Sequence, residues 1–153
     1  MKIQQEICYL TYQSFPAETA NSLQTISNIK YLVKNGADVE LIFPLREKNS
    51  SESLEKIKQH YSTKENFKVT GVKHFLPFGR INILEGFFFH ISHFLWSYFV
   101  VTFKIKKTDR KKFITRSDWI LYFLARKGCT VLFECHQTSK VRTFIINRSK
   151  NYP

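Results

Sequence analysis

The sequence predicts an α/β protein built on a doubly wound parallel sheet with the strand order 3-2-1-4-5. Short apolar runs, which are typical of strands buried on both faces, alternate along the chain with segments of helical periodicity. Polar turns follow these runs, and parallel sheets bind their ligands at that end of the strands. We expect one domain at residues 1–146, incomplete at its carboxyl end, and a polar tail at residues 147–153.

Residues 7–43 predict one βαβ unit. The apolar run 7–10 indicates a strand that is buried on both faces. A helix follows, because Asn21 begins a capping-box pattern and Gly36 is a typical helix end. The apolar run 39–43 then indicates the second strand.

The rest of the chain continues the alternation of strands and helices. Ser117 or Asp118 can cap a helix that Gly128 ends. The expected elements are a helix at 53–61, a weak strand region at 67–75, an apolar helix at 81–105, a strand at 113–115, a helix at 119–126, a strand at 130–133 and a helix at 139–146.

The segment 81–105 is the most apolar part of the chain, and residues 86–103 contain no Asp, Glu, Lys or Arg. A basic run follows it, which is typical of a segment on an anionic membrane surface. A membrane span is the alternative, but His90, His93 and two serines interrupt the apolar run. We expect a packed helix that also contacts the membrane. We expect structural roles for both histidines, with a role as ligands as the alternative.

The net charge of +12 predicts attraction to an anionic partner. Nucleic acid, anionic lipid and phosphorylated sugars all fit this charge. Nucleic acid is disfavoured, because the aromatic residues cluster in one apolar helix instead of alternating with basic residues as stacking platforms. An anionic membrane surface or a sugar nucleotide is the expected partner.

The three cysteines, Cys8, Cys129 and Cys135, lack the spacing of a metal site. We expect small buried residues in a reducing compartment. The first apolar run is too short for a secretory signal and follows Glu6, which favours a cytoplasmic location. Membrane contact by 81–105 would place the protein peripherally at the inner face of the membrane.

Three polar turns, 12–21, 115–118 and 134–140, follow the first, fourth and fifth predicted strands. In the order 3-2-1-4-5 these turns converge beside the reversal of strand order, between strands one and four. The opposite ends of the strands carry little beyond lysines and ordinary turns. We therefore expect the ligand site at the carboxyl ends of the strands.

The residue types in these turns indicate their chemistry. Arg116 offers a charged, forked donor, although a surface arginine is the alternative. Glu134 and His136 point to the same side and can bind sugar hydroxyls or move a proton, with a solvated pair as the alternative. No metal-ligand set, Ser-His-Asp arrangement, Walker loop or paired-carboxylate motif occurs, so we expect no metal. The side chains that can hold an anionic phosphate at the first helix are Thr19, Asn21 and Ser22.

Four stretches of the chain, 12–25, 43–47, 114–117 and 133–136, resemble the amino-terminal domain of family 4 glycosyltransferases, which have the GT-B fold. They read YQSFPAETANSLQT, FPLRE, ITRS and FECH. The similarity spans about residues 6–142. The first turn lacks the glycines that many members carry. That domain is Rossmann-like, so the resemblance implies the same doubly wound sheet.

The resemblance implies retaining transfer of a sugar from a nucleotide-sugar donor to a glycan or lipid-linked acceptor, without a metal or another cofactor. It places His136 near the donor sugar and the acceptor, as the catalytic residue. It places Thr19 and Asn21 near the donor phosphates, and Arg116 and Glu134 on the acceptor side.

In that family a carboxy-terminal domain binds the nucleotide sugar with two glutamates separated by seven residues. We expect this domain and its glutamate pair to lie outside the 153 residues. The chain would then be an acceptor-side half that is inactive alone. The alternative is a non-catalytic, basic peripheral-membrane or binding module on the same fold.

Overall fold

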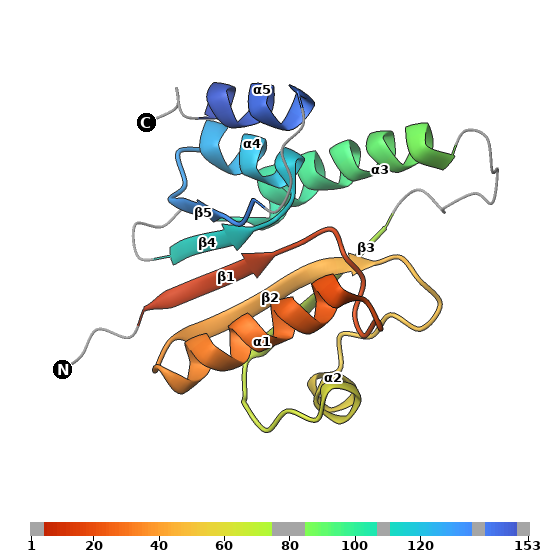
Figure 1. The fold of residues 1–153 in the computed structure, drawn as a ribbon, viewed down its shortest axis with the longest axis vertical. Coiled ribbons are helices and arrows are strands. Elements are labelled where there is room, and N and C mark those ends of the chain that lie inside the picture. Colours follow the sequence, from red (N-terminus) through yellow and green to blue (C-terminus); the bar gives the residue numbers. More distant parts are fainter. Residues whose placement is uncertain (1–4, 75–84, 107–110, 136–139, 150–153) are drawn as a thin grey trace.

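The structure is a computed structural model that describes residues 5–74, 85–106, 111–135 and 140–149. In these ranges five parallel strands form one sheet in the order β3-β2-β1-β4-β5, with helices on both faces (Figure 1). The predicted fold class and strand order are confirmed. The elements are β1 (Glu6–Leu10), α1 (Ala20–Lys34), β2 (Asp38–Leu45), α2 (Leu54–Tyr61), β3 (Lys68–Lys73), α3 (Glu85–Phe99), the π-helical turn η1 (Val100–Lys104), β4 (Lys111–Thr115), α4 (Asp118–Arg126), β5 (Val131–Phe133) and α5 (Lys140–Ser149).

β1 lies in the sheet between β2 and β4. Tyr9 of β1 is in register with Leu41 of β2 and with Ile114 of β4. The chain builds outward from β1 to β3 and then returns to the other side of β1 at β4, so the strand order reverses between β1 and β4. The carboxyl ends of β1, β4 and β5 therefore lie side by side at this reversal.

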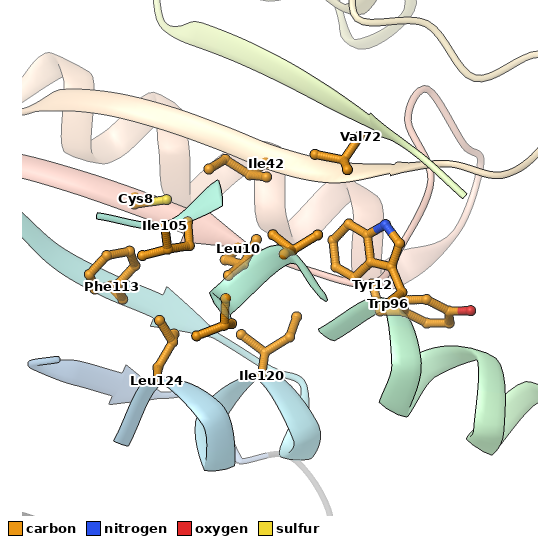
Figure 2. Packing of buried hydrophobic residues seen from close by; sticks show 12 residues of the cluster. Cys8, Leu10, Tyr12, Ile42, Val72, Trp96, Ile105, Phe113, Ile120 and Leu124 are labelled. Atoms are coloured by element: carbon orange, nitrogen blue, oxygen red, sulfur yellow. The ribbon is translucent and has the colours of Figure 1, made fainter. Parts of the chain in front are cut away.

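Each face of the sheet has its own hydrophobic core, because alternate residues of a strand point to opposite faces. Ile7 and Tyr9 pack with residues of α1 and α2. Cys8 and Leu10 pack with residues of α3, η1 and α4 (Figure 2). Each fully buried Ile, Leu or Phe side chain contributes about 1.5–3 kcal/mol to folding. Packing on both faces therefore fixes the positions of the strand ends.

α1 begins earlier than the capping-box pattern at Asn21 predicts. The hydroxyl of Thr19 accepts a hydrogen bond from the backbone nitrogen of Ser22 at 3.2 Å. The hydroxyl of Ser22 accepts from the backbone nitrogen of Thr19 at 3.1 Å. The prediction is wrong because a serine takes the part that glutamate or glutamine usually has in a capping box. Gly36 has a φ of +85°, which glycine adopts without strain, and it follows the end of the helix as predicted.

The apolar segment 81–105 contains α3, which continues directly into η1. Trp96 and Val100 are buried, whereas Leu95 and Tyr98 are 47% and 46% exposed. In the part of the chain that the structure describes, no helix combines the length and the apolar character that a membrane crossing requires. α3 is therefore a packed helix with an exposed, partly aromatic side.

α5 continues through the first three residues of the expected tail and ends at Ser149. Ser149 is buried, and its hydroxyl donates to the carbonyl of Ile145 at 2.8 Å. Nε of Arg142 in α5 lies 2.8 Å from Oδ1 of Asp118 in α4. This ion pair ties the last described helix to the helix that packs on the sheet.

The cysteines differ in exposure. Cys8 is buried as expected, and this burial raises the pKa of its thiol to about 12. Its thiolate is therefore scarce at neutral pH. Cys135 is exposed, so the expectation of burial is wrong for this residue, which lies beyond the end of β5.

Candidate functional site

Glu134 is the centre of a polar cluster at the carboxyl end of the sheet. Its Oε2 accepts a hydrogen bond from the Tyr9 hydroxyl at 2.7 Å and lies 2.8 Å from Nε of Arg116. Its Oε1 accepts a hydrogen bond from Nδ2 of Asn28 at 2.8 Å. We call these four residues, Glu134, Arg116, Tyr9 and Asn28, the glutamate cluster.

The glutamate cluster is assembled at the reversal of strand order. Tyr9 belongs to β1 and Asn28 to α1, while Arg116 and Glu134 directly follow β4 and β5. Nη1 of Arg116 also donates to the carbonyl oxygen of Asn21 at 3.3 Å, which joins the end of β4 to the first turn of α1. The sequence predicted that Arg116 and Glu134 would lie together, and the structure brings them into an ion pair.

The glutamate cluster holds two opposite charges largely away from solvent. The side chains of Arg116 and Glu134 are 11% and 20% exposed. Burial and the hydrogen bond to Glu134 raise the pKa of Tyr9 well above its usual value, so the phenol stays neutral and donates. Hydrogen bonds to a charged group are about twice as strong as those between neutral groups. The orientation of the Glu134 carboxylate is therefore well determined.

The three residues predicted to contact a donor phosphate lie at the start of α1. The hydroxyls of Thr19 and Ser22 are engaged in the helix cap, and Ser22 also donates to the Thr19 carbonyl at 2.8 Å. The side-chain amide of Gln13 donates to the Thr19 hydroxyl. Asn21 is exposed and Ser22 is buried. A role in phosphate binding stays a prediction for all three residues.

His136, the predicted catalytic residue, lies outside the described residues, which stop at Cys135 and resume at Lys140. Its catalytic role stays a prediction. Over the described ranges, no three His, Cys, Asp or Glu residues are grouped so that they could hold a metal ion.

The chain contains one pair of glutamates separated by seven residues, Glu47 and Glu55, although the sequence analysis placed such a pair outside it. Glu47 follows β2 and pairs with Arg46 at 3.0 Å. Glu55 lies in the first turn of α2 with its side chain 84% exposed. Neither glutamate belongs to the glutamate cluster.

A second polar cluster at the carboxyl end was missed by the sequence analysis. Oη of Tyr12 lies 2.8 Å from Nε2 of His74 and 2.9 Å from Oγ of Ser92, and those two atoms are 2.9 Å apart. The ring of His93 stacks on Tyr12 with a centroid separation of 4.2 Å. Nε2 of His93 is hydrogen-bonded to the hydroxyl of Ser117. We call these five residues the histidine cluster.

The histidine cluster lies on the α3 face of the sheet, opposite the glutamate cluster on the α1 face. Burial, helped by the charges of His90 and Arg46, lowers the pKa of His93 to about 3, so this imidazole is neutral at pH 7. The Arg46 guanidinium lies 5.1 Å from the centre of the Tyr12 ring, within cation–π range. The signal in the sequence was the group of His and Ser residues that interrupts the apolar segment.

An apolar groove of about 750 Å³ runs between α3, α4 and α5, which lie together on one side of the sheet (Figure 1). The ring of Phe94 contacts Trp119 and Phe123 at centroid distances of 5.0 and 5.2 Å. Arg126 and Arg148 also line the groove. The aromatic residues of this surface, which we call the aromatic groove, are Phe94, Tyr98, Trp119, Tyr122, Phe123 and Phe144.

Comparisons with protein-family models, with curated proteins and with solved structures find no match to this chain. The resemblance to family 4 glycosyltransferases therefore rests on the four stretches of sequence quoted above.

Proposed function

We propose that this chain is the acceptor-binding half of a retaining glycosyltransferase, which moves a sugar from a nucleotide-sugar donor to an acceptor. The observation that carries the proposal is the ion pair of Glu134 and Arg116, held at the reversal of strand order by Tyr9 and Asn28. Open α/β sheets bind ligands at that position. The resemblance at 114–117 and 133–136 supports the same assignment.

The chemistry of the pair suits a sugar. A carboxylate accepts a hydrogen bond from a sugar hydroxyl, and a guanidinium donates to the oxygen of the same or a neighbouring hydroxyl. Tyr9 and Asn28 orient the Glu134 carboxylate before any ligand arrives, so the sugar would meet a preformed site. The 20% of the Glu134 side chain that is exposed is the part that would contact the ligand.

The proposal assigns the nucleotide sugar to a second domain, as the resemblance implies, and requires no metal. His136 follows Glu134 by two residues. In this proposal His136 acts beside the transferred sugar, while Glu134 and Arg116 hold the acceptor.

Saturation-transfer NMR on the 153-residue chain, with a panel of disaccharides and alkyl glycosides, tests acceptor binding. We expect at least one glycoside to bind, and Arg116→Gln to weaken its binding roughly tenfold, since a hydrogen bond to a charged group is worth about 1.5–3 kcal/mol. The matched control is Lys34→Gln, which also removes one positive charge from an ion pair, because the Lys34 side chain is 65% exposed and lies 3.5 Å from Glu65. Failure of every glycoside to bind, or equal weakening by both variants, would contradict the proposal.

A second candidate function is that of a peripheral-membrane module, and the aromatic groove favours it. Phe144 and Tyr98 in the groove are 68% and 46% exposed, and Arg126 and Arg148 lie beside them. Exposed aromatic side chains next to cations suit the interface of an anionic bilayer, as does the net charge of +12. This role is compatible with acceptor binding when the acceptor is lipid-linked.

Vesicle flotation tests the membrane role. We expect the chain to float with vesicles that contain phosphatidylglycerol, and to float less in high salt, which screens the charges. Tyr98→Ser with Phe144→Ser should abolish flotation. The matched control, Leu23→Ser with Tyr31→Ser, removes two residues of α1 that are 57% and 70% exposed, and it should float normally. If Tyr98→Ser with Phe144→Ser still floats with the vesicles, the aromatic groove is not the membrane contact.

A further inference from the structure

The amino-terminal half of β2 and β3 carries polar residues on the α3 face of the sheet. Glu40 of β2 is in register with Cys8 of β1 and with Lys68 of β3. Two residues further along β2, Ile42 is buried in the core on this face (Figure 2). Strands inside a parallel sheet are usually apolar on both faces. A glutamate at this position therefore marks a part of the sheet that packed side chains leave open.

A hollow of about 660 Å³ occupies this open part of the sheet. Its apolar floor is formed by Ile42, Val72, Phe99 and Ile105. Five lysines line it, and they are Lys68, Lys73, Lys104, Lys106 and Lys111. Its volume falls within the range of about 300–1,000 Å³ that is typical of small-molecule sites.

The charges around the hollow are unbalanced. Glu40 lies 3.1 Å from Nζ of Lys68 and 2.6 Å from Nζ of Lys111. Although burial opposes it, hydrogen bonds from Lys111, Thr70 and Lys68 hold the pKa of Glu40 below its usual value, so the carboxylate stays charged. Among the described residues of the lining, the other acidic residue is Glu6, and five lysines against two glutamates leave a net charge of +3.

We propose that this hollow is a binding site for a small organic phosphate, whose phosphate meets the lysines and whose apolar body covers the floor. Lys104 and Lys106 flank Ile105, which is 5% exposed and forms part of the floor. A phosphate held by these two lysines therefore lies next to the apolar surface. Lysine ammonium groups bind phosphate as point charges with several donors. This proposal does not depend on glycosyl transfer.

The ligand class follows from the two parts of the lining. Inorganic phosphate would use the lysines but leave the apolar floor uncovered. An apolar molecule without an anion would leave the excess positive charge uncompensated. Only a ligand with both parts uses the whole hollow, and its phosphate monoester can belong to a soluble metabolite or to a lipid headgroup.

NMR titration of the ¹⁵N-labelled chain with phenyl phosphate tests the proposal. We expect shifts of the backbone amides of Thr70 and Gly71, which line the hollow. Lys104→Gln with Lys106→Gln should raise the dissociation constant by about tenfold, because two charged donors are lost. The matched control, Lys56→Gln with Lys64→Gln, removes the same charge from exposed positions elsewhere and should change it less than about twofold.

Two outcomes of this titration would overturn the proposal. Equal weakening by both double variants would show attraction to the net charge alone. If inorganic phosphate binds as tightly as phenyl phosphate, the apolar floor does not contribute to binding.

Vesicles of phosphatidylcholine with phosphatidic acid distinguish a lipid from a soluble source. A lipid headgroup is the ligand if the chain binds these vesicles, if phenyl phosphate displaces it from them, and if Lys104→Gln with Lys106→Gln abolishes the binding. Binding of phenyl phosphate at Thr70 and Gly71 without such vesicle binding would support a soluble ligand. Absence of both would overturn the proposal.

Discussion

The two ends of the parallel sheet hold their polar residues in opposite ways. At the carboxyl end, Glu134 has one cation and two neutral donors, and all three are in direct contact with it. At the amino end, Glu40 contacts two lysines beside an open hollow with an excess of positive charge. The carboxyl end is therefore preorganised and balanced, whereas the amino end is open and has charge left to attract a ligand.

This difference follows from how the chain reaches each end. Arg116 and Glu134 lie in turns that directly follow β4 and β5, so the pairing of these two strands brings them together. The polar residues of the hollow come from β2 and β3, from the first residues of β1 and β4, and from the end of η1, where Lys104 lies. Their side chains therefore line an open space, in which Glu40 contacts Lys68 and Lys111.

The largest expected effect of a single substitution is that of Glu134→Ala on folding. The change leaves the Arg116 guanidinium, 11% exposed, without its carboxylate and removes the acceptor of Tyr9 and Asn28. We expect the free energy of unfolding to fall by about 3–4 kcal/mol, since breaking a buried ion pair costs about 3–5 kcal/mol. Urea denaturation followed by circular dichroism measures this change.

Glu55→Ala is the control for that prediction. It breaks a pair with Lys58, 3.9 Å long, in which the Glu55 side chain is 84% exposed, and we expect a loss of less than about 1 kcal/mol. Equal losses for the two variants would contradict the contrast between a held carboxylate and a solvated one.

Part of the carboxyl-end site could be predicted from sequence. Strand order and the position of turns after apolar runs place Arg116 and Glu134 at one edge of the sheet. Tyr9 and Asn28 could not be found in this way. Tyr9 lies inside an apolar strand, where an aromatic residue usually means core packing, and Asn28 lies within a helix. Their contacts to Glu134 span 125 and 106 residues of sequence and depend on how α1 packs on the sheet.

The histidine cluster escaped prediction for a related reason. His93 and Ser92 lie in an apolar segment whose helical period alone does not say which residue meets which strand end.

At the amino end, the sequence did contain a signal. Glu40 lies between Val39 and Leu41 in a strand that pairs on both sides, and an ordinary buried strand would be apolar there. We expected little beyond lysines and ordinary turns at this end, although the excess of lysines over acidic residues marks the hollow.

A smaller effect is expected from the pH dependence that His93 confers. The pKa of His93 is about 3 in the folded chain and about 6.5 in an unfolded one, so the unfolded chain takes up the proton first as pH falls. Its contribution to stability is complete above pH 6.5 and is lost below it, by up to about 1.4 kcal/mol per pH unit. Urea denaturation at several pH values between 7 and 5 should therefore show that the free energy of unfolding falls as the pH falls. This slope should be shallower in His93→Gln.

His60→Gln is the control for this slope, because His60 is an exposed residue of α2. This variant keeps the His93 imidazole, so its slope should stay steeper than that of His93→Gln. If the free energy of unfolding depends on pH equally in wild type and in His93→Gln, burial of this imidazole does not cause the loss of stability in acid.

The smallest expected effect on folding is that of Glu40→Gln, and it separates the two ends of the sheet most sharply. The Glu40 side chain is 14% exposed, but glutamine keeps its size and one acceptor oxygen, and the Lys68 and Lys111 side chains, which are 68% and 23% exposed, can be solvated by water. We expect a loss of about 1 kcal/mol in urea denaturation. Phenyl phosphate should bind roughly threefold tighter, because a negative charge has left the hollow.

The comparison variant is Glu134→Gln, which removes the same charge at the other end of the sheet. It should leave phenyl phosphate binding unchanged, since Glu134 does not line the hollow. Weaker binding by Glu40→Gln would mean that Glu40 positions Lys68 and Lys111 for the ligand, and the amino end would then be preorganised like the carboxyl end. Tighter binding would leave the contrast intact, with repulsion by Glu40 limiting an open, basic site.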